Sequence, residues 1–243
     1  MARDPAVSTG RLNSSCLAPG PASEDALASE HARVLADLLG QRIESAERIG
    51  GGRNSRVYQV RCGATEYVAK FYFRTTADGR DRAQIEHSAF DFLWQRGVRC
   101  IPQPHVADYA RQVALYGFVD GGAVDAATVS VGDVDQLVAF VRALKTIATD
   151  PASRALGPAA EAFFTVGGVI GNVTERLRRL EAVDAQGPSY DALRHFLHDE
   201  FVPSLGALSE WARARGDADA ELPWPQRTLS PSDLGFHNAL REA

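Results

Sequence analysis

Lysine is the scarcest charged residue in this chain of 243 residues. Of the 26 basic residues, only Lys70 and Lys145 are lysines. The three cysteines, Cys16, Cys62 and Cys100, are odd in number and lack the C-x-x-C spacing, which argues against both a disulfide framework and a cysteine zinc site. We therefore expect a reducing compartment.

Long apolar runs are also absent. No stretch approaches the roughly eighteen residues that span a bilayer, and the N-terminal end lacks the apolar segment of a signal peptide. A formal net charge of -5 argues against nucleic-acid binding as the main task, because phosphate backbones attract basic surfaces. We expect a cytoplasmic globular protein with neither a membrane nor a nucleic acid as its partner. The hydrophobic content of 45% suits one large domain or two closely packed lobes.

The most distinctive motif lies close to the C-terminal end. Asp233 and Asn238 stand at D-x-x-x-x-N spacing in the stretch T-L-S-P-S-D-L-G-F-H-N. In phosphoryl transfer, such a loop supplies a carboxylate that accepts the proton of an attacking hydroxyl and an amide oxygen that binds magnesium. Asp and Asn are also common in turns and helix caps, so turn formation is the alternative interpretation.

A second motif occurs nearer the N-terminal end and fits G-x-G-x-x-G-x-V, with serine in place of the third glycine. Its residues are Gly50, Gly51, Gly52, Arg53, Asn54, Ser55 and Val57. Small residues let backbone N–H groups approach phosphate oxygens. Residues 57–60 and 67–72 are typical of strands around a turn at Gly63, which indicates a β-hairpin rather than a strand–helix dinucleotide site. The alternative is an ordinary glycine-rich β-turn.

One of the two lysines follows this hairpin in the sequence Val68-Ala69-Lys70. Residues 81–96 have the pattern of a helix, with Glu86 on its apolar side. A carboxylate on an inward face is costly without a cation, so we expect Glu86 to pair with Lys70 and to hold it towards phosphates. The alternative is an exposed pair between Glu86 and Arg82 on the same helix.

The remaining segments are predicted from composition and periodicity. Residues 1–22 are rich in Ala, Pro, Ser and Gly and are expected to form a mobile tail, followed by a helix with Ser23 as its N-cap that ends at Gly40. Residues 104–118 alternate as two strands with a turn near 109–111. Apolar stripes predict further amphipathic helices around residues 134–144, 170–180, 193–201 and 205–211.

Taken together, the glycine-rich hairpin, the V-A-K strand, the helix with an inward glutamate and the late D-x-x-x-x-N loop resemble the aminoglycoside phosphotransferase and choline kinase-like family. The resemblance covers Glu47 to Leu240 in order and spacing. It implies an α+β, protein-kinase-like two-lobed fold with a small antiparallel β-sheet lobe and a mainly helical lobe. We expect the nucleotide-binding lobe with its leading helix at 23–118, and an incomplete helical lobe with the catalytic loop at 119–243.

The resemblance also implies an ATP-dependent phosphotransferase that acts on a hydroxyl group of a small molecule, with ATP and Mg²⁺ as cofactors. Asp233 would be the catalytic base and Asn238 the magnesium ligand. Lys70, oriented by Glu86, would bind the α- and β-phosphates below the 50–55 loop. The hinge that binds adenine through its backbone would be Tyr116, Gly117, Phe118 and Val119. An edge strand that enters a loop is the alternative for this last segment.

Two features depart from the family pattern. The histidine that commonly stands two positions before the catalytic aspartate is replaced by Pro231, and His237 occupies a different position, beside Asn238. The metal-binding aspartate of a following D-F-G-like or D-x-D-like hairpin has no counterpart before Ala243. We therefore expect a C-terminally truncated chain. If these residues are the whole protein, nucleotide binding should be weak and turnover slow or absent, whereas an intact longer version would be a competent kinase. The alternative functions are a non-catalytic nucleotide-binding pseudokinase and an inactive remnant.

Overall fold

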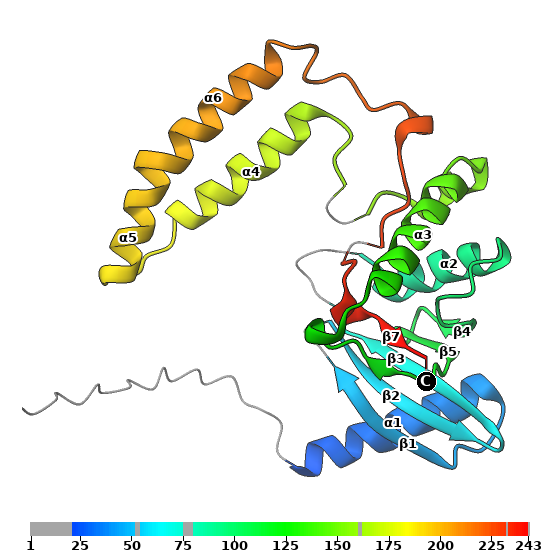
Figure 1. Ribbon diagram of the computed structural model, residues 1–243. Helices are drawn as coiled ribbons and strands as arrows, with labels where there is room; N and C mark the ends of the chain where they lie inside the picture. The colour runs from blue at the N-terminus through cyan, green and yellow to red at the C-terminus, as the bar shows by residue number, and fades with distance from the viewer. Residues whose placement is uncertain (1–20, 52–53, 75–79, 160–161, 232, 243) are drawn as a thin grey trace, which may run out of the picture. The chain divides into compact units, whose positions relative to one another are not determined.

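The chain folds into two compact units, whose elements are labelled in Figure 1. The computed structural model describes residues 21–51, 54–74, 80–159, 162–231 and 233–242. Unit 1 consists of the described residues up to His87 together with 102–118, and unit 2 consists of 88–101 and the described residues from Val119 onward. The tail predicted for residues 1–22 lies outside the described residues, except for its last two positions, which are helical.

Unit 1 is built on a five-stranded antiparallel sheet. Its strands are β1 (Ser45–Gly51), β2 (Ser55–Cys62), β3 (Thr65–Tyr72), β4 (Pro104–Asp108) and β5 (Val113–Gly117). Their order across the sheet is β1-β2-β3-β5-β4, which makes β3 the central strand. The predicted turns at Gly63 and near residues 109–111 are both confirmed. Gly63 has a φ of 61°, the left-handed conformation that favours glycine.

Helix α1 (Pro21–Leu39) precedes the sheet. Pro21 is the first residue of this helix that the structure describes. Pro21 and Ala22 are already helical, so the prediction that Ser23 is the N-cap is wrong. The predicted end is confirmed, because Gly40 follows the helix with a φ of 61°.

The core of unit 1 lies between α1 and one face of the sheet, and Figure 1 shows α1 lying across the strands. Leu35 of α1 is fully buried there. It belongs to a buried cluster with Tyr58, Val60, Ala69, Phe71, Val113 and Leu115. His31, one turn earlier on α1, stacks on the ring of Phe71 with their centroids 3.8 Å apart. The leading helix is thus an integral part of the folded sheet unit.

Helix α2 (Arg82–Gln95) begins on the opposite face of the sheet. Side chains alternate along a strand, so Lys70 points away from the face that α1 covers. The carboxylate of Asp81 accepts a hydrogen bond of 2.8 Å from an N–H in the first turn of α2. The helix ends before Gly97, whose φ is 83°, so the helix predicted for residues 81–96 is confirmed.

Unit 2 is mainly helical. Its longer helices are α3 (Val131–Ile147), α4 (Val166–Glu181), α5 (Pro188–Phe196) and α6 (Val202–Arg213). A π-helical turn (Leu197–Phe201) joins α5 to α6, so the predicted segment 193–201 crosses a change of helix type. Short 3₁₀ helices lie at Ala126–Thr128, Pro151–Leu156, Trp224–Gln226 and Phe236–Asn238. The strands β6 (Gly122–Ala123) and β7 (Leu240–Arg241) pair antiparallel.

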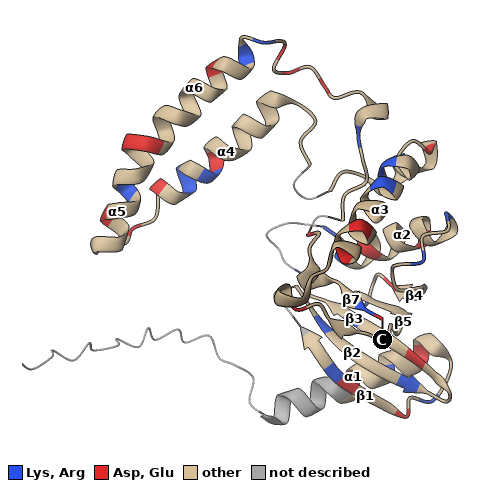
Figure 2. Cartoon of the chain, in the orientation of Figure 1, with Lys and Arg blue, Asp and Glu red and all other residues tan. Residues whose placement is uncertain are grey.

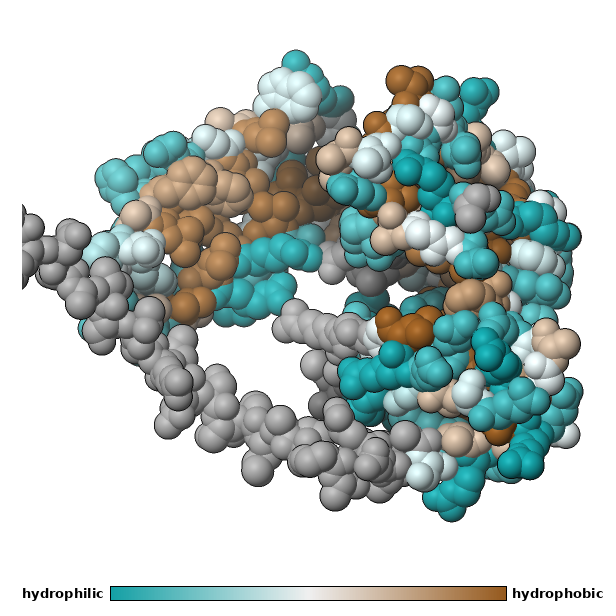
Figure 3. Space-filling view, turned by 60° about the horizontal axis from the view of Figure 1, so that its bottom comes forward, coloured by the Kyte–Doolittle hydropathy of each residue, from teal (hydrophilic) through white to brown (hydrophobic). Residues whose placement is uncertain are grey.

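A small apolar core and a mixed surface characterise unit 2. Phe92, Leu93, Val98 and Leu144 are buried together, and Leu229 packs against them just before the Asp233 loop. Figure 2 shows acidic and basic residues interspersed along the helices. Figure 3 shows hydrophobic residues gathered over α4 to α6. Exposed hydrophobic residues of α4 and α6 include Val169 and Leu208. No helix in the described part of the chain is long and apolar enough to cross a membrane.

Candidate active site

Lys70 lies on the central strand β3, two residues before its end. Its cross-strand partners are Val57 on β2 and Ala114 on β5, so hydrogen-bonded strands hold its backbone on both sides. Cross-strand partners share one face of a sheet, and residues two apart along a strand do the same. Val68 therefore shares the face of Lys70, whereas Ala69 is fully buried on the α1 side. Within the V-A-K motif, Val68 is therefore the residue whose side chain shares the sheet face of Lys70.

Glu86 is positioned by the way in which α2 begins. Asp81 accepts a second hydrogen bond, of 2.9 Å, from the side chain of Gln112 in the turn between β4 and β5. Gln112 is buried and has a φ of 55°, an uncommon conformation for a residue other than glycine. Its carbonyl accepts from the N–H of Tyr72 at 2.8 Å, at the end of β3. One turn residue thereby joins the start of α2 to the strand that carries the lysine.

The predicted pair of Lys70 with Glu86 is present. The Nζ of Lys70 donates to both carboxylate oxygens of Glu86 at 2.8 Å. The two side chains are 28% and 30% exposed, so water reaches them only in part. Charge-assisted hydrogen bonds in such surroundings are short and directional. The arrangement fixes a primary ammonium group on the sheet face away from α1.

Two tyrosines lie behind this ion pair. The hydroxyl oxygens of Tyr72 and Tyr116 are 3.0 Å apart and buried. The Nζ of Lys70 lies 5.2 Å from the centroid of the Tyr72 ring. Burial, and then the charge of Glu86, raises the pKa of Tyr72 far above its usual range, and burial and Glu86 raise the pKa of Tyr116 in the same order. Both phenols therefore stay protonated hydrogen-bond donors at any physiological pH.

The glycine-rich motif is more strand-like than the sequence predicted. Gly50 and Gly51 belong to β1, where they pair with Val57 and Arg56 next to an irregularity in register. Glycine tolerates such irregularities because it lacks a Cβ. Ser55 is buried in β2, and the carbonyl of Asn54 accepts from the N–H of Phe73 at 2.9 Å. Gly52 and Arg53 lie outside the described residues. The connection between the strands is thus shorter than the predicted 50–55 loop.

The predicted hinge comprises the end of β5 and the two residues after it. Tyr116 and Gly117 are strand residues, and Phe118 comes directly after them. The N–H of Gly117 donates to the carbonyl of Gln103 at 2.7 Å, and the N–H of Phe118 donates to the carbonyl of Glu66 at 3.3 Å. Two amides of the segment thus already bond within unit 1. Val119, the fourth predicted hinge residue, belongs to unit 2.

The loop that carries the D-x-x-x-x-N motif lies in unit 2 and is open to solvent. The side chain of Asp233 is 79% exposed, and its Oδ1 lies 3.3 Å from the Nε2 of His237. The same nitrogen lies 3.1 Å from the Nδ2 of Asn238. When this nitrogen is protonated it can donate to the carboxylate of Asp233, and when it is unprotonated it can accept from the amide of Asn238. A side chain at Gly235 would meet the His237 ring at 2.7 Å. Glycine at that position therefore leaves room for the imidazole.

Asn238 closes the loop back on the aspartate. Its Nδ2 donates to the backbone carbonyl of Asp233 at 2.9 Å. This bond fixes the amide, and it leaves Oδ1 as the side-chain atom that can bind a cation. An oxygen donor of this kind suits Mg²⁺, which binds few protein ligands and takes others from substrate phosphates and water. In the described part of the chain, no group of three or more His, Cys, Asp or Glu residues lies close enough to hold a metal ion.

A charged clamp follows the loop. Arg241 on β7 donates to both carboxylate oxygens of Asp133, at 3.1 and 2.7 Å, and to the carbonyl of Thr128 at 3.2 Å. Asp133 also bonds Ser130 to form the capping box that begins α3. Arg241 and then Ser130 hold the pKa of Asp133 well below its usual range. A Cβ at Gly121 would come within 2.9 Å of the Arg241 carbonyl, so the approach of β6 to β7 requires glycine.

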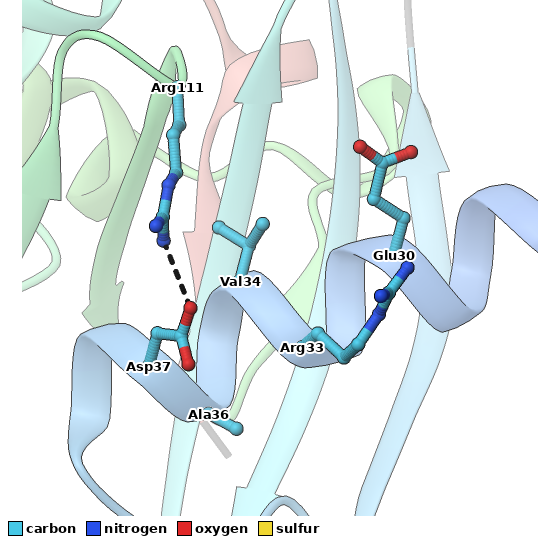
Figure 4. Close-up of a pocket in the computed structure, with 6 residues that line it drawn as sticks. All are labelled: Glu30, Arg33, Val34, Ala36, Asp37 and Arg111. Carbon is cyan, nitrogen blue, oxygen red and sulfur yellow. Dashed lines mark hydrogen bonds and ion pairs between the residues drawn. The ribbon is translucent and has the colours of Figure 1, made fainter.

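A hollow among the described residues of unit 1 lies elsewhere on this unit. It measures about 390 Å³ and is lined by α1 and by Arg111 from the β4–β5 turn. Figure 4 shows the ion pair of Arg111 with Asp37 at one end, with Glu30 and Arg33 further along α1. Its lining mixes both charges, and it is on the α1 side of the sheet. Lys70 does not line this hollow.

Three contacts were not predicted from the sequence. Tyr72 could have been found from the strand period, because it lies two residues beyond Lys70 and so must share its face. His237 follows Asp233 by four residues. That spacing brings side chains together on a helix, but in a loop it does not predict whether they meet. The bond of Arg241 to Asp133 links positions 108 residues apart, and no local pattern signals it.

Comparison with known proteins places these features in a family. The model of the phosphotransferase enzyme family matches residues 45–229. The crystal structure of a spectinomycin phosphotransferase in complex with ADP and spectinomycin has a TM-score of 0.59 and 15% sequence identity, over 88% of this chain and 65% of that chain. Choline kinase LicA from Streptococcus pneumoniae has a TM-score of 0.43 and 15% identity, over 80% and 58% of the two chains. No curated protein sequence matches.

The chain thus spans just under two thirds of the length of the spectinomycin phosphotransferase that it resembles. At 15% identity this likeness concerns the fold, and it confirms the α+β, protein-kinase-like fold class. The family match carries the assignment further, because residues 45–229 are well over half of the chain. The chain belongs to the phosphotransferase enzyme family, the group of aminoglycoside phosphotransferase and choline kinase-like proteins that its motifs indicated.

Proposed function

We propose that this protein is an ATP-dependent phosphotransferase that transfers the γ-phosphoryl group to a hydroxyl group of a small molecule. The observation that carries the proposal is the Lys70–Glu86 pair on the sheet face opposite α1, in a chain of this family. We also propose that residues 23–118 form the nucleotide-binding lobe and residues 119–243 the lobe with the catalytic loop. The family match ends at residue 229, so the roles given below to Asp233 and Asn238 rest on their chemistry and geometry.

Unit 1 would provide the positive charge that binds the triphosphate. Lys70 presents an ammonium group whose direction is set by two bonds to Glu86. An ammonium held in this way can bind α- and β-phosphate oxygens without a large reorganisation of its side chain. Backbone N–H groups of the connection between β1 and β2 would cover the phosphates. Val57 and Val68 flank Lys70 on the same face and offer apolar surface for the base.

Adenine recognition would fall to backbone groups of the hinge that the sheet leaves available. The amides of Gly117 and Phe118 already donate within unit 1. The carbonyl of Gly117 and the N–H of Val119 are therefore the groups that we assign to the base. Tyr116, which precedes them, has its hydroxyl turned to Tyr72 rather than to the base.

Asp233 would act as the general base of the transfer. Its carboxylate accepts the proton of the substrate hydroxyl while the hydroxyl oxygen forms a bond to the γ-phosphorus and the bond from that phosphorus to the β-bridging oxygen breaks, which releases ADP. His237, 3.3 Å away, is placed to orient the carboxylate. Wide exposure leaves the carboxylate accessible to a hydroxyl substrate. Bound Mg²⁺ would neutralise phosphate charge, and Asn238 would contribute its Oδ1.

A second candidate function is nucleotide binding without transfer. The observation that favours it is that the described residues around Asn238 include no cluster of metal-binding side chains. A neutral amide binds Mg²⁺ less strongly than a carboxylate does. Weak binding of the ion would slow phosphoryl transfer much more than nucleotide binding, because the ion chiefly stabilises charge in the transition state.

A pair of measurements distinguishes the two functions. The first is the shift in melting temperature caused by ATP with Mg²⁺, and the second is transfer of labelled γ-phosphate to a panel of hydroxyl compounds, which includes aminoglycosides, spectinomycin, choline and sugars. A thermal shift with transfer supports the phosphotransferase. A thermal shift without transfer to any acceptor supports the binding protein, and no shift with no transfer contradicts both.

The two lysines provide a matched pair of variants. Lys70→Met should abolish the thermal shift, because it removes the phosphate ligand and retains the aliphatic stem. Lys145→Met should retain the shift, since Lys145 on α3 donates to the carbonyls of residues 225–227 and not to the sheet. If both variants respond to ATP like the unmodified protein, Lys70 does not bind the nucleotide.

A further inference from the structure

The second lysine of the chain, Lys145, has no role in the function proposed above. It lies in the last turn of α3, and its Nζ donates to the backbone carbonyls of Pro225, Gln226 and Arg227 at 3.3, 2.8 and 2.8 Å. An ammonium group carries three N–H donors on one atom, which suits three acceptors that converge on a point, whereas a guanidinium spreads its donors in a plane. Apart from Lys70, every other Lys or Arg position of the chain is arginine. The choice of lysine at position 145 therefore matches the contact that it makes.

The three carbonyls need an outside donor because of the local sequence. Residues 223–227 read Pro-Trp-Pro-Gln-Arg, and Trp224–Gln226 form a 3₁₀ helix. The two prolines have no N–H and a fixed φ, so the segment is stiff. The N–H groups of Gln226 and Arg227 bond back to the carbonyls of Pro223 and Trp224. The carbonyls of residues 225–227 lie at the C-terminal end of this helix, where a helix has no N–H groups left to bond them. Lys145 supplies the missing donors.

This stiff segment leads directly into the Asp233 loop. Leu229 follows it and packs against the buried cluster that contains Leu144, the neighbour of Lys145 on α3. After the loop, Arg241 bonds Asp133 near the start of the same helix. Bonds within the loop set its shape, and α3 holds the chain on both sides of it. All these residues belong to unit 2.

We propose that Lys145 is a positioning residue for the Asp233 loop, because its bonds to the carbonyls of residues 225–227 fix the direction in which the chain enters the loop. The proposal deepens the function proposed above and rests on it for its meaning in catalysis, since Asp233 is the general base there. Without the lysine, the loop retains its internal bonds but is held less firmly against α3. The carboxylate of Asp233 then meets the substrate hydroxyl in the productive geometry less often.

The first test needs no turnover. Hydrogen exchange followed by mass spectrometry compares Lys145→Met with the unmodified protein, as the full chain without nucleotide. The amides of residues 226–227 report on the lysine contact itself. The amides of residues 238–239, which bond to carbonyls within the Asp233 loop, report on the loop. We expect exchange about tenfold faster at both pairs of amides, the effect of losing hydrogen bonds from a charged group.

Arg142→Met is the matched control for this measurement. Arg142 is an exposed cation one turn earlier on α3, and its side chain forms no bond within the described part of the chain. The control removes the same charge from the same helix, so both pairs of amides should exchange as in the unmodified protein. Faster exchange confined to residues 226–227 in Lys145→Met would mean that the lysine fixes only its own contact. That result, or no change at either pair, would overturn the proposal.

Turnover separates positioning from stability. Lys145→Met should lower kcat about tenfold and leave the KM for ATP near its original value, because the nucleotide is bound from unit 1. Combined with Asp233→Asn, it should lower the residual rate by less than about twofold, since misplacing a side chain that no longer accepts the proton costs little. A loss of about tenfold in both backgrounds would mean that less of the protein is folded, and would overturn the proposal. If no acceptor is phosphorylated, the proposed transfer fails, and the exchange comparison alone decides the role of Lys145.

Discussion

The two regions to which we assign chemistry are built in opposite ways. Lys70 lies on the central strand and bonds Glu86 of α2, and the start of α2 is bonded to the buried Gln112 of the β4–β5 turn. Asp233 lies in an exposed loop whose side-chain contacts, to His237 and Asn238, are local in sequence. The Lys70 region is fixed by contacts with the folded core, whereas the Asp233 loop is fixed mainly by contacts within the loop.

This difference implies that the two regions respond differently to substitution. A group fixed by buried neighbours is coupled to the stability of its unit, because those neighbours lose contacts when it is removed. A group on an exposed loop can lose its function while the fold remains unchanged. The segment after the loop nevertheless has long-range attachments, which are the pairing of β7 with β6 and the bonds of Arg241 to Asp133 and Thr128. Substitutions at these positions therefore test whether the contrast is real.

The largest effect is expected from Asp233→Asn. The amide retains the shape of the side chain but cannot accept the proton of a substrate hydroxyl, so phosphoryl transfer should fall by about 10²–10⁴-fold. Because the side chain is 79% exposed, the melting temperature should not change measurably. The measurement is initial transfer rate beside a thermal melt, with and without ATP. A variant that retains full turnover would exclude Asp233 as the base, and one that melts early would contradict the contrast between the regions.

The next effect concerns the core that supports Lys70. Leu35→Ala removes a side chain that is fully buried between α1 and the sheet, and should destabilise the protein by about 2–5 kcal/mol. The matched control is Leu208→Ala on α6, where the side chain is 62% exposed and the expected change stays within about 0.5 kcal/mol. Chemical denaturation measures both. Similar losses for the two variants would show that α6 is as tightly packed as α1.

Local sequence patterns were sufficient to predict most helices and strands and the Lys70–Glu86 pair. Strand alternation, the glycine turns and the helix over residues 81–96 are set by short-range chemistry, and a carboxylate on an apolar helix face needed a cation. Since the chain has only two lysines, few partners were available. The Ser23 cap was wrong because the two residues before it are already helical.

The features that the sequence did not predict depend on strand register and on distant contacts. The meeting of Tyr72 with Tyr116 requires knowing that Ala114 lies opposite Lys70, which follows from the pairing of β3 with β5 and not from either strand alone. The strand character of Gly50 and Gly51 was missed because glycine patterns usually indicate turns. The assignments of Asp233, Asn238 and the hinge to nucleotide chemistry remain predictions.

A smaller effect is expected from Arg241→Ala, which tests the long-range side-chain attachment that follows the loop. Without the guanidinium, β7 loses its bonds to Asp133 and Thr128, and turnover should fall roughly tenfold through misplacement of the loop while the ATP-induced thermal shift persists. Arg178→Ala, which removes an exposed pair with Glu175, is the control and should leave turnover unchanged. Arg241 holds the pKa of Asp133 low, so the effect should be the same at pH 5.5 and pH 7.5. Full activity would mean that the loop needs no anchor.

The smallest effect is a dependence of stability on pH that originates in α1. His31 stacks on Phe71, and its Nδ1 lies 3.1 Å from the Tyr58 hydroxyl. Burial, and then the positive charge of Arg56, lowers the pKa of His31, whereas Glu30 raises it by less. The unfolded chain therefore binds a proton more readily than the folded chain does. The stability contributed by neutral His31 is present above the unfolded pKa of about 6.5 and is lost as the pH falls towards the lower folded value.

His31→Gln isolates this contribution, because glutamine can still accept from Tyr58 but does not titrate. We expect the unmodified protein to melt at a lower temperature at pH 5.5 than at pH 7.5, and the difference to shrink in His31→Gln. Some difference should remain, since burial also lowers the pKa of His105 in the same unit. His198→Gln, on the exposed π-helical turn of unit 2, should melt with the pH dependence of the unmodified protein. An equal reduction in both variants would place the acid sensitivity outside the α1 contact and remove this distinction between the two units.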